Sequence, residues 1–129
     1  MVKPLAVFLG LVVIGSSAAR ADAVYDACMK TAVTNFDFGE CGQAYLKRAD
    51  DALNAAWKQI YRLASGQTAK DLLAEEHAWV AYKEKSCLFY ANGDSGRQGQ
   101  VISFPQCRGG VIEQRTKDLV GIGKDLAPH

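Results

Sequence analysis

Four cysteines constrain this chain more than any other feature, because all of them follow a short apolar leader and none lies inside it. They are Cys28, Cys41, Cys87 and Cys107. An even number of cysteines in a small exported chain predicts a disulfide framework, whereas the same number in a cytosolic chain would indicate metal binding or redox chemistry. We therefore expect an exported fold that is braced by two disulfides.

The leader has the parts of a secretory signal peptide. Lys3 supplies a positive charge, residues 5–14 supply an apolar stretch, and the triplet Ala-Arg-Ala places the cleavage site after Ala21. The apolar stretch is shorter than the roughly 20 residues that a spanning helix needs. We predict that residues 1–21 are a cleavable signal peptide. Residues 22–129 are expected to form a single domain, exported to the periplasm or the cell exterior, without stable membrane insertion.

The charge balance of the mature chain excludes some classes of partner. Loss of Lys3 and Arg20 leaves 13 of the 15 basic residues against 14 acidic ones, so the formal charge of the mature chain is −1. Charges of both signs are interspersed, and such a chain has no electrostatic footprint for nucleic acid or for an anionic membrane. We predict no nucleic-acid partner.

Apolar residues recur at steps of three or four over most of the mature chain, which predicts amphipathic helices. The expected helices cover residues 24–33, 41–64, 68–90 and a last segment from Pro105 to about Gly121. Residues 35–39 are turn-like, and the third helix is expected to begin with a capping box at Thr68 to Asp71. A short link joins the second and third helices, so they should form a central antiparallel hairpin. The predicted fold is an all-α, disulfide-braced bundle of about four helices.

The longest connection, residues 92–106, is the candidate site for binding a partner. It has three glycines and little periodicity, apart from an expected extended piece at residues 101–104. Loops of this length are usually functional or disordered, and the flanking cysteines could staple the ends of this one. A functional loop and a connection with no function of its own fit this segment equally well. The candidate contact residues within it are Asp94, Ser95 and Arg97.

The sequence contains no set of residues that matches a known catalytic arrangement. Residues 93–96 repeat the Gly-Asp-Ser-Gly of trypsin-like proteases, but those enzymes need two β-barrels, and Arg97 stands where they have a further glycine. His77 is expected in a helix, and only the terminal His129 could assist it. We predict that the protein is not an enzyme.

The cysteine spacing also argues against a metal or a cofactor. The intervals between the cysteines contain 12, 45 and 19 residues, whereas zinc sites usually use close Cys-x-x-Cys pairs. The chain has no Cys-x-x-Cys-His for covalent haem. We expect neither a metal nor a cofactor.

The sequence leaves the disulfide connectivity open, because four cysteines allow three pairings. We favour the two local pairs, Cys28 with Cys41 and Cys87 with Cys107. An antiparallel hairpin would also bring Cys41 and Cys87 to the same end, so a Cys41–Cys87 bond is a competing pairing.

Three side chains invite a functional interpretation but are better explained by packing. Trp57 and Trp79 are expected to pack between helices, since large aromatic residues are more often core than binding residues. Arg115 lies on an otherwise apolar helix face, where it could bind carbonyls or a carboxylate such as Asp50 and hold the last helix to the hairpin. Contact with a partner is the alternative for Arg115.

The cysteines and the residues between them form an ordered pattern that covers nearly the whole mature chain. Besides the cysteines, the pattern comprises Tyr45, Asp50, Leu53, Asn54, Trp57, Trp79, Lys83, Arg115 and Leu119. This pattern resembles the lysozyme inhibitor LprI-like family of small exported bacterial proteins. Three positions depart from the family: Glu76 replaces the usual glutamine, Lys83 replaces an arginine, and Ile112 stands where a threonine is common.

The resemblance implies an all-α fold and inhibition of peptidoglycan-cleaving lysozymes. A lysozyme or another cell-wall hydrolase is then the expected partner, bound without covalent chemistry so that its active-site cleft is occluded. A charge of −1 offers little long-range steering toward the many lysozymes that are strongly cationic. The alternatives are an envelope binding or immunity module, and a structural or stress-response protein, with no inhibition of lysozyme.

Overall fold

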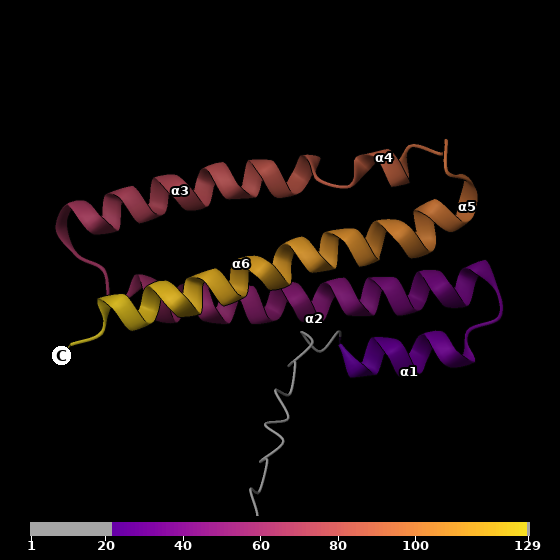
Figure 1. Cartoon of the computed structure of the whole chain (residues 1–129), viewed down its shortest axis with the longest axis horizontal. Coiled ribbons are helices and arrows are strands. Elements are labelled where there is room, and N and C mark those ends of the chain that lie inside the picture. Colours follow the sequence, from indigo (N-terminus) through magenta and orange to yellow (C-terminus); the bar gives the residue numbers. More distant parts are fainter. Residues whose placement is uncertain (1–21, 129) are drawn as a thin grey trace, which may run out of the picture.

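The computed structural model describes residues 22–128, so the predicted signal peptide lies outside the described residues. The described part is all-α, which confirms the predicted fold class (Figure 1). Its elements are α1 (Ala23–Thr31), α2 (Asn35–Tyr61), α3 (Gly66–Lys85), α4 (Leu88–Ala91), α5 (Gly96–Gln98), the π-helix η1 (Gly99–Ser103) and α6 (Phe104–Leu126).

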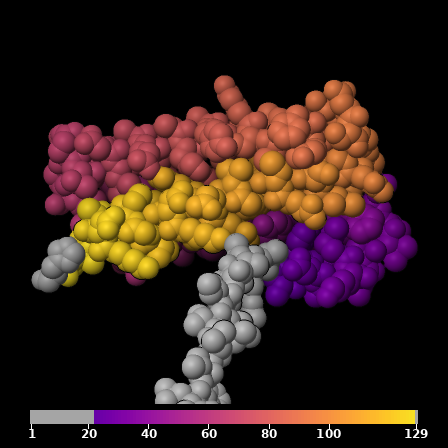
Figure 2. Space-filling view, in the orientation of Figure 1, coloured from indigo at the N-terminus to yellow at the C-terminus, as the bar shows by residue number. Residues whose placement is uncertain are grey.

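The four longer helices lie lengthwise in an elongated bundle. The predicted hairpin is present, because α3 runs back along the bundle after the short link that follows α2 (Figure 1). Helix α6 runs in the same direction as α2 and packs closely against it, while α1 covers the first part of α2. The space-filling view shows α3 and α6 side by side along the length of the molecule (Figure 2). The α1–α2 turn and α5 lie at one end of the bundle, and the α2–α3 link lies at the other.

The core lies mainly between α2 and α6. Ile112 and Leu119 of α6 are the most completely buried large side chains of the described chain, and they join Ala49, Leu53, Ile60 and Leu72 in one cluster. Glycines allow the close approach of the helices, because a side chain at Gly109 would collide with the ring of Tyr45, and one at Gly123 would collide with Ile60. The close packing of α2 and α6 therefore depends on small residues placed opposite large ones.

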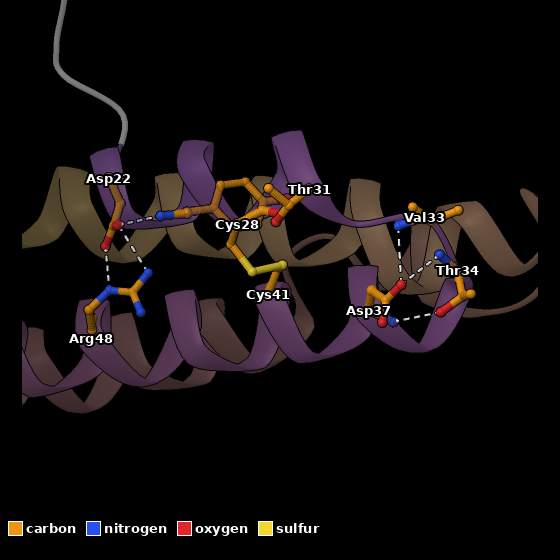
Figure 3. Close-up of a disulfide and its surroundings, with 9 residues drawn as sticks. Asp22, Cys28, Thr31, Val33, Thr34, Asp37, Cys41 and Arg48 are labelled. Atoms are coloured by element: carbon orange, nitrogen blue, oxygen red, sulfur yellow. Dashed lines mark hydrogen bonds and ion pairs between the residues drawn. A yellow bond between two sulfur atoms is a disulfide. The ribbon is translucent and has the colours of Figure 1, made fainter.

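The predicted turn at residues 35–39 is wrong, because α2 begins at Asn35. A capping box starts this helix: the Thr34 hydroxyl accepts from the Asp37 amide at 3.1 Å, and the Asp37 carboxylate accepts from the Thr34 amide at 2.8 Å (Figure 3). Two backbone donors that would otherwise lack partners are thus satisfied at the helix start. The Thr-x-x-Asp spacing is the signal in the sequence that predicts this start.

The bounds of the third helix also differ from the prediction. Helix α3 begins at Gly66, with Ser65 at its N-cap, so the proposed capping box at Thr68 to Asp71 is wrong. The helix ends at Lys85 rather than near residue 90, because Cys87 has a φ of 69° in the left-handed region. A residue in that conformation cannot continue a right-handed helix.

The predicted long connection is mostly helical. Residues 96–103 form α5 and η1, so the expected extended piece at residues 101–104 is wrong. Helix α6 does not stop at Gly121 but continues to Leu126. In these last turns Gly123 packs against Ile60, where a larger side chain would collide.

The disulfides join the two local cysteine pairs. Cys28 of α1 is bonded to Cys41 of α2, and Cys87 is bonded to Cys107 of α6, with Cα–Cα distances of 5.8 and 5.9 Å. The competing Cys41–Cys87 bond is therefore absent, and none of the four cysteines is free. One bond fixes α1 to α2, and the other closes the segment that contains α4, α5 and η1.

An ion pair provides a second attachment of α1 to α2. Asp22 caps α1 by accepting from the Tyr25 amide at 2.8 Å, and it also accepts from Arg48 at 2.7 and 2.9 Å (Figure 3). The hydrogen bond from Arg48 is the main cause that holds the pKa of Asp22 below its ordinary value.

We predict that this pair makes stability depend on pH in acid. Because the folded-state pKa of Asp22 is depressed, its contribution is present above the unfolded-state pKa and is lost as the pH falls through the folded-state pKa. An Arg48→Gln variant should lose about 1 kcal/mol of unfolding free energy at pH 7 and less at an acid pH below the folded-state pKa of Asp22. Urea titrations at both pH values measure this, with Lys47→Gln as the control, because Lys47 and Asp51 form an exposed pair. Equal losses at both pH values would contradict the prediction.

Candidate functional site

The structure places the three predicted contact residues together at the end of the bundle that contains α5 (Figure 1). Asp94, Ser95 and Arg97 are all exposed. The amide of Asp94 donates to the Asn92 side chain at 2.9 Å, and the Arg97 guanidinium donates to the Gln100 amide oxygen at 3.1 Å. Gly93 and Gly96 adopt positive φ angles of 100° and 68°, which lets the chain turn tightly on either side of Asp94 and Ser95. We refer to residues 93–97 as the loop tip.

Contacts with the following turn hold the loop tip in place. Gln100 donates to the carbonyl of Ala91 at 3.3 Å, across the base of the loop. Gly99 is buried, and a side chain there would collide with Ser95 and crowd the carbonyl of Tyr90. The Cys87–Cys107 disulfide ties the start of this segment to α6. These contacts order the segment, and a binding role for the loop tip stays a prediction.

A groove joins the loop tip to the first turns of α2. It has a volume of about 220 Å³ and is lined by Gly39, Gln43, Leu46, Arg97, Gln100, Val101, Phe104 and Pro105. Val101 and Pro105 are buried and form an apolar floor, while two glutamines and the arginine supply polar groups. Gly39 was not expected on a helix, because residues 35–39 were predicted to form a turn. Gln43 lay within the predicted second helix, but loop length and composition did not relate it to the site. The Thr34–Asp37 capping box is the signal that would have placed Gly39 on a helix.

A buried charge cluster links α3 to α6 away from the loop tip. Arg115 donates through Nε and Nη2 to Oε2 of Glu76, at 3.0 and 2.7 Å, and through Nη1 to Glu75 at 2.6 Å. Burial acts to lower the pKa of Arg115, but the hydrogen bonds that it donates to Glu75 and Glu76 outweigh burial and raise the pKa. The guanidinium also lies 5.9 Å from the centre of the Trp79 ring. Three hydrogen bonds from Arg115 to the two glutamates thus hold α3 to α6.

The sequence matches a protein-family model over most of its length. The family model described as "Lysozyme inhibitor LprI" matches residues 27–119. The chain belongs to the LprI family. Comparisons with curated proteins and with solved structures return no match.

The LprI match includes the loop tip, both disulfides and the charge cluster. Most of the side chains in the predicted LprI pattern pack within the helical framework. Leu53 and Leu119 are core residues, the ring of Tyr45 stacks on Tyr25, and the half-buried Trp57 stacks on Tyr61. Asn54 is exposed on α2. The pattern therefore defines the framework of an LprI protein more than its binding surface.

Arg115 does hold the last helix to the hairpin, but the predicted partner Asp50 is wrong. Asp50 instead forms an ion pair with Lys83 at 3.8 Å, and Lys83 also pairs with Glu84 at 3.4 Å. The Glu76 of this LprI chain, which departs from the usual glutamine, accepts two of the Arg115 bonds. Glu76 and Arg115 thus form a matched pair in this member.

Within residues 22–128, no group of three or more histidine, cysteine, aspartate or glutamate residues is arranged to hold a metal ion. None of the helices there has the length and apolar character that crossing a bilayer requires.

Proposed function

We propose that this LprI-family protein is exported and inhibits a peptidoglycan-cleaving lysozyme by binding non-covalently over its active-site cleft. The match of the family model over residues 27–119 carries the proposal. The protein then acts by binding rather than by catalysis. Residues 1–21 serve as a cleavable signal peptide, and the two disulfides suit an oxidising compartment outside the cytosol.

The loop tip supplies the groups that would enter the cleft. Lysozymes cleave glycan with a pair of carboxylates, and an arginine can bind a carboxylate through two parallel hydrogen bonds. The guanidinium of Arg97 is exposed, and one of its nitrogen atoms donates to Gln100, so other donors remain for a partner. Ser95 stands two residues before it and adds a hydroxyl. Because disulfide and hydrogen bonds already order this segment, binding loses little conformational entropy.

A panel of lysozyme types, assayed for clearing of peptidoglycan with the purified mature protein, tests the proposal. We expect inhibition of at least one type at micromolar concentration, and a loss of affinity of about tenfold or more in a Ser95→Ala, Arg97→Ala double variant. The matched control is Arg62→Ala, Ser65→Ala, which removes the same side-chain types from exposed positions at the opposite end of the bundle.

Two results would count against the proposal at different levels. Absence of inhibition across the panel at micromolar concentration would defeat the inhibitor function. If the wild type inhibits and the loop-tip double variant inhibits equally well, the inhibitor function holds but the loop tip does not contribute to it.

A further inference from the structure

Two large apolar side chains are exposed to solvent at the turn between α1 and α2. Val33 is 82% exposed and Phe36 is 73% exposed, the highest values among the exposed large apolar residues of the described chain. Single exposed apolar residues are ordinary, but here two lie within four positions at the tip of one turn. Neither contributes to the clusters that hold the bundle together.

The backbone that carries these two side chains is firmly held. The Asp37 carboxylate accepts from the amides of Val33 and Thr34, at 3.1 and 2.8 Å, and the Cys28–Cys41 disulfide fixes α1 to α2 nearby (Figure 3). Phe36 is the second residue of α2, so it is displayed from an ordered helix start. Rigid display of an aromatic side chain lowers the entropic cost of burying it against a partner.

The turn lies beside the loop tip rather than on a separate face. Gln43 of α2 and Arg97 line the same groove. Phe36 precedes Gln43 by seven positions, which is nearly two full helical turns, so both side chains lie on one face of α2. Helical side chains tilt toward the N-terminus, so that of Phe36 projects toward the end of the bundle. Phe36 therefore lies on the face of α2 whose Gly39 and Gln43 line the groove with Arg97.

The charges of this end suit a cationic partner that carries carboxylates in its cleft. Asp37, Glu40 and Asp94 lie on the turn, the first turns of α2 and the loop tip, against the cations Arg97 and Lys30. Backbone hydrogen bonds from Thr34 and Val33 hold the pKa of Asp37 below its ordinary value, so it stays ionised at neutral pH. The carboxylates of Asp37 and Glu40 are placed to pair with basic groups of a partner, while Arg97 remains available for a carboxylate.

The loop tip alone is also too small for a stable complex. A standard interface takes about 800 Å² from each partner, and its affinity usually depends on buried aromatic or arginine side chains surrounded by a polar rim. The loop tip offers an arginine but no large apolar side chain. The turn provides the missing apolar contact.

We propose that Val33 and Phe36 are the apolar anchor of the inhibitory interface, and that the partner is a cationic cell-wall hydrolase with an apolar depression beside its carboxylate cleft. This inference rests on the proposed function. The loop tip meets the catalytic carboxylates, Phe36 enters the neighbouring depression, and the groove between them is covered in the complex.

The test uses the mature protein and the lysozyme that it inhibits best. Phe36→Ala should weaken inhibition by about tenfold or more, Val33→Ser should weaken it less, and Phe36→Tyr should retain most of it. The matched control is Tyr82→Ala, because Tyr82 is 60% exposed on α3, beside a different groove between α3 and α6. All four variants should unfold at the wild-type urea concentration, since none of these side chains is buried. Hydrogen exchange in the complex should show protection of residues 33–43 together with residues 92–101.

Each outcome decides a different point. If the wild-type protein inhibits no lysozyme, the proposed function and this inference both fail. If the wild type inhibits and Phe36→Ala inhibits equally well, only the inference fails. If Tyr82→Ala loses inhibition while Phe36→Ala retains it, the interface lies in the α3–α6 groove and the inference is overturned.

Discussion

Replacement of Arg115 by alanine is expected to lower the free energy of unfolding by about 3–5 kcal/mol. The side chain of Arg115 is only 7% exposed and that of Glu76 only 10%. Without the guanidinium, Glu76 keeps a buried charge that has lost both of its hydrogen bonds from Arg115, and an uncompensated buried charge is far more costly than the net value of the pair. Urea unfolding followed by far-UV circular dichroism measures the loss.

Two variants of the acidic side of the cluster serve as controls. Glu75 is 58% exposed, so Glu75→Ala should cost no more than about 1 kcal/mol. Glu76→Gln keeps an oxygen that can accept from Arg115, and Glu75 still balances the charge, so its cost should also be well below that of Arg115→Ala. If Arg115→Ala costs no more than Glu75→Ala, the buried half of the cluster does not provide the stabilisation.

The sequence predicted the helical segments well where their periodicity was long. The apolar spacing of α2 and the last helix marked their central turns, and the shortness of the α2–α3 link predicted the antiparallel hairpin. The π-helix could not be predicted in this way. Its five residues lie where Val101 packs against Gly39, just before Pro105 packs against Gly42, and periodicity does not reveal such tertiary contacts.

The partner of Arg115 illustrates a second limit. The sequence indicated that this arginine would hold the last helix to the hairpin, and it does. Whether it meets Asp50 of α2 or Glu76 of α3 depends on the rotation of α6 about its axis, which the packing of Gly109 against Tyr45 fixes. Periodicity identifies a buried face but not the register between two faces.

The candidate site was predictable in one half only. Loop length and composition directed attention to Asp94, Ser95 and Arg97, which do lie together on the surface. The other half, around Phe36, was hidden because a turn was assigned where a capping box begins α2. The pattern that relates the chain to the LprI family consists largely of core and framework residues, so it predicts the scaffold and leaves the binding surface to be found in three dimensions.

Removal of the Cys87–Cys107 disulfide is expected to affect stability and inhibition together. The bond spans 20 residues, and in the chain-entropy model its loss through Cys87→Ala, Cys107→Ala costs about 3 kcal/mol of unfolding free energy. The same change releases the start of the segment that carries the loop tip, so part of that segment must become ordered on binding. Inhibition should therefore weaken even where the double variant remains folded, and this can be assayed well below its melting temperature.

The backbone at Cys87 allows a sharper version of this experiment. Cys87 has a φ of 69°, a conformation that costs an alanine about 1 kcal/mol or more and costs glycine little. Cys87→Gly, Cys107→Ala should therefore be more stable than Cys87→Ala, Cys107→Ala by about 1 kcal/mol. In the control pair, glycine should have the opposite effect on stability, because Cys28 lies inside α1. The Cys28→Gly, Cys41→Ala variant should be less stable than the Cys28→Ala, Cys41→Ala variant by a similar amount. If glycine is less stable than alanine at both positions, the backbone at Cys87 is not left-handed. That left-handed conformation ends α3 and directs the chain toward the loop tip.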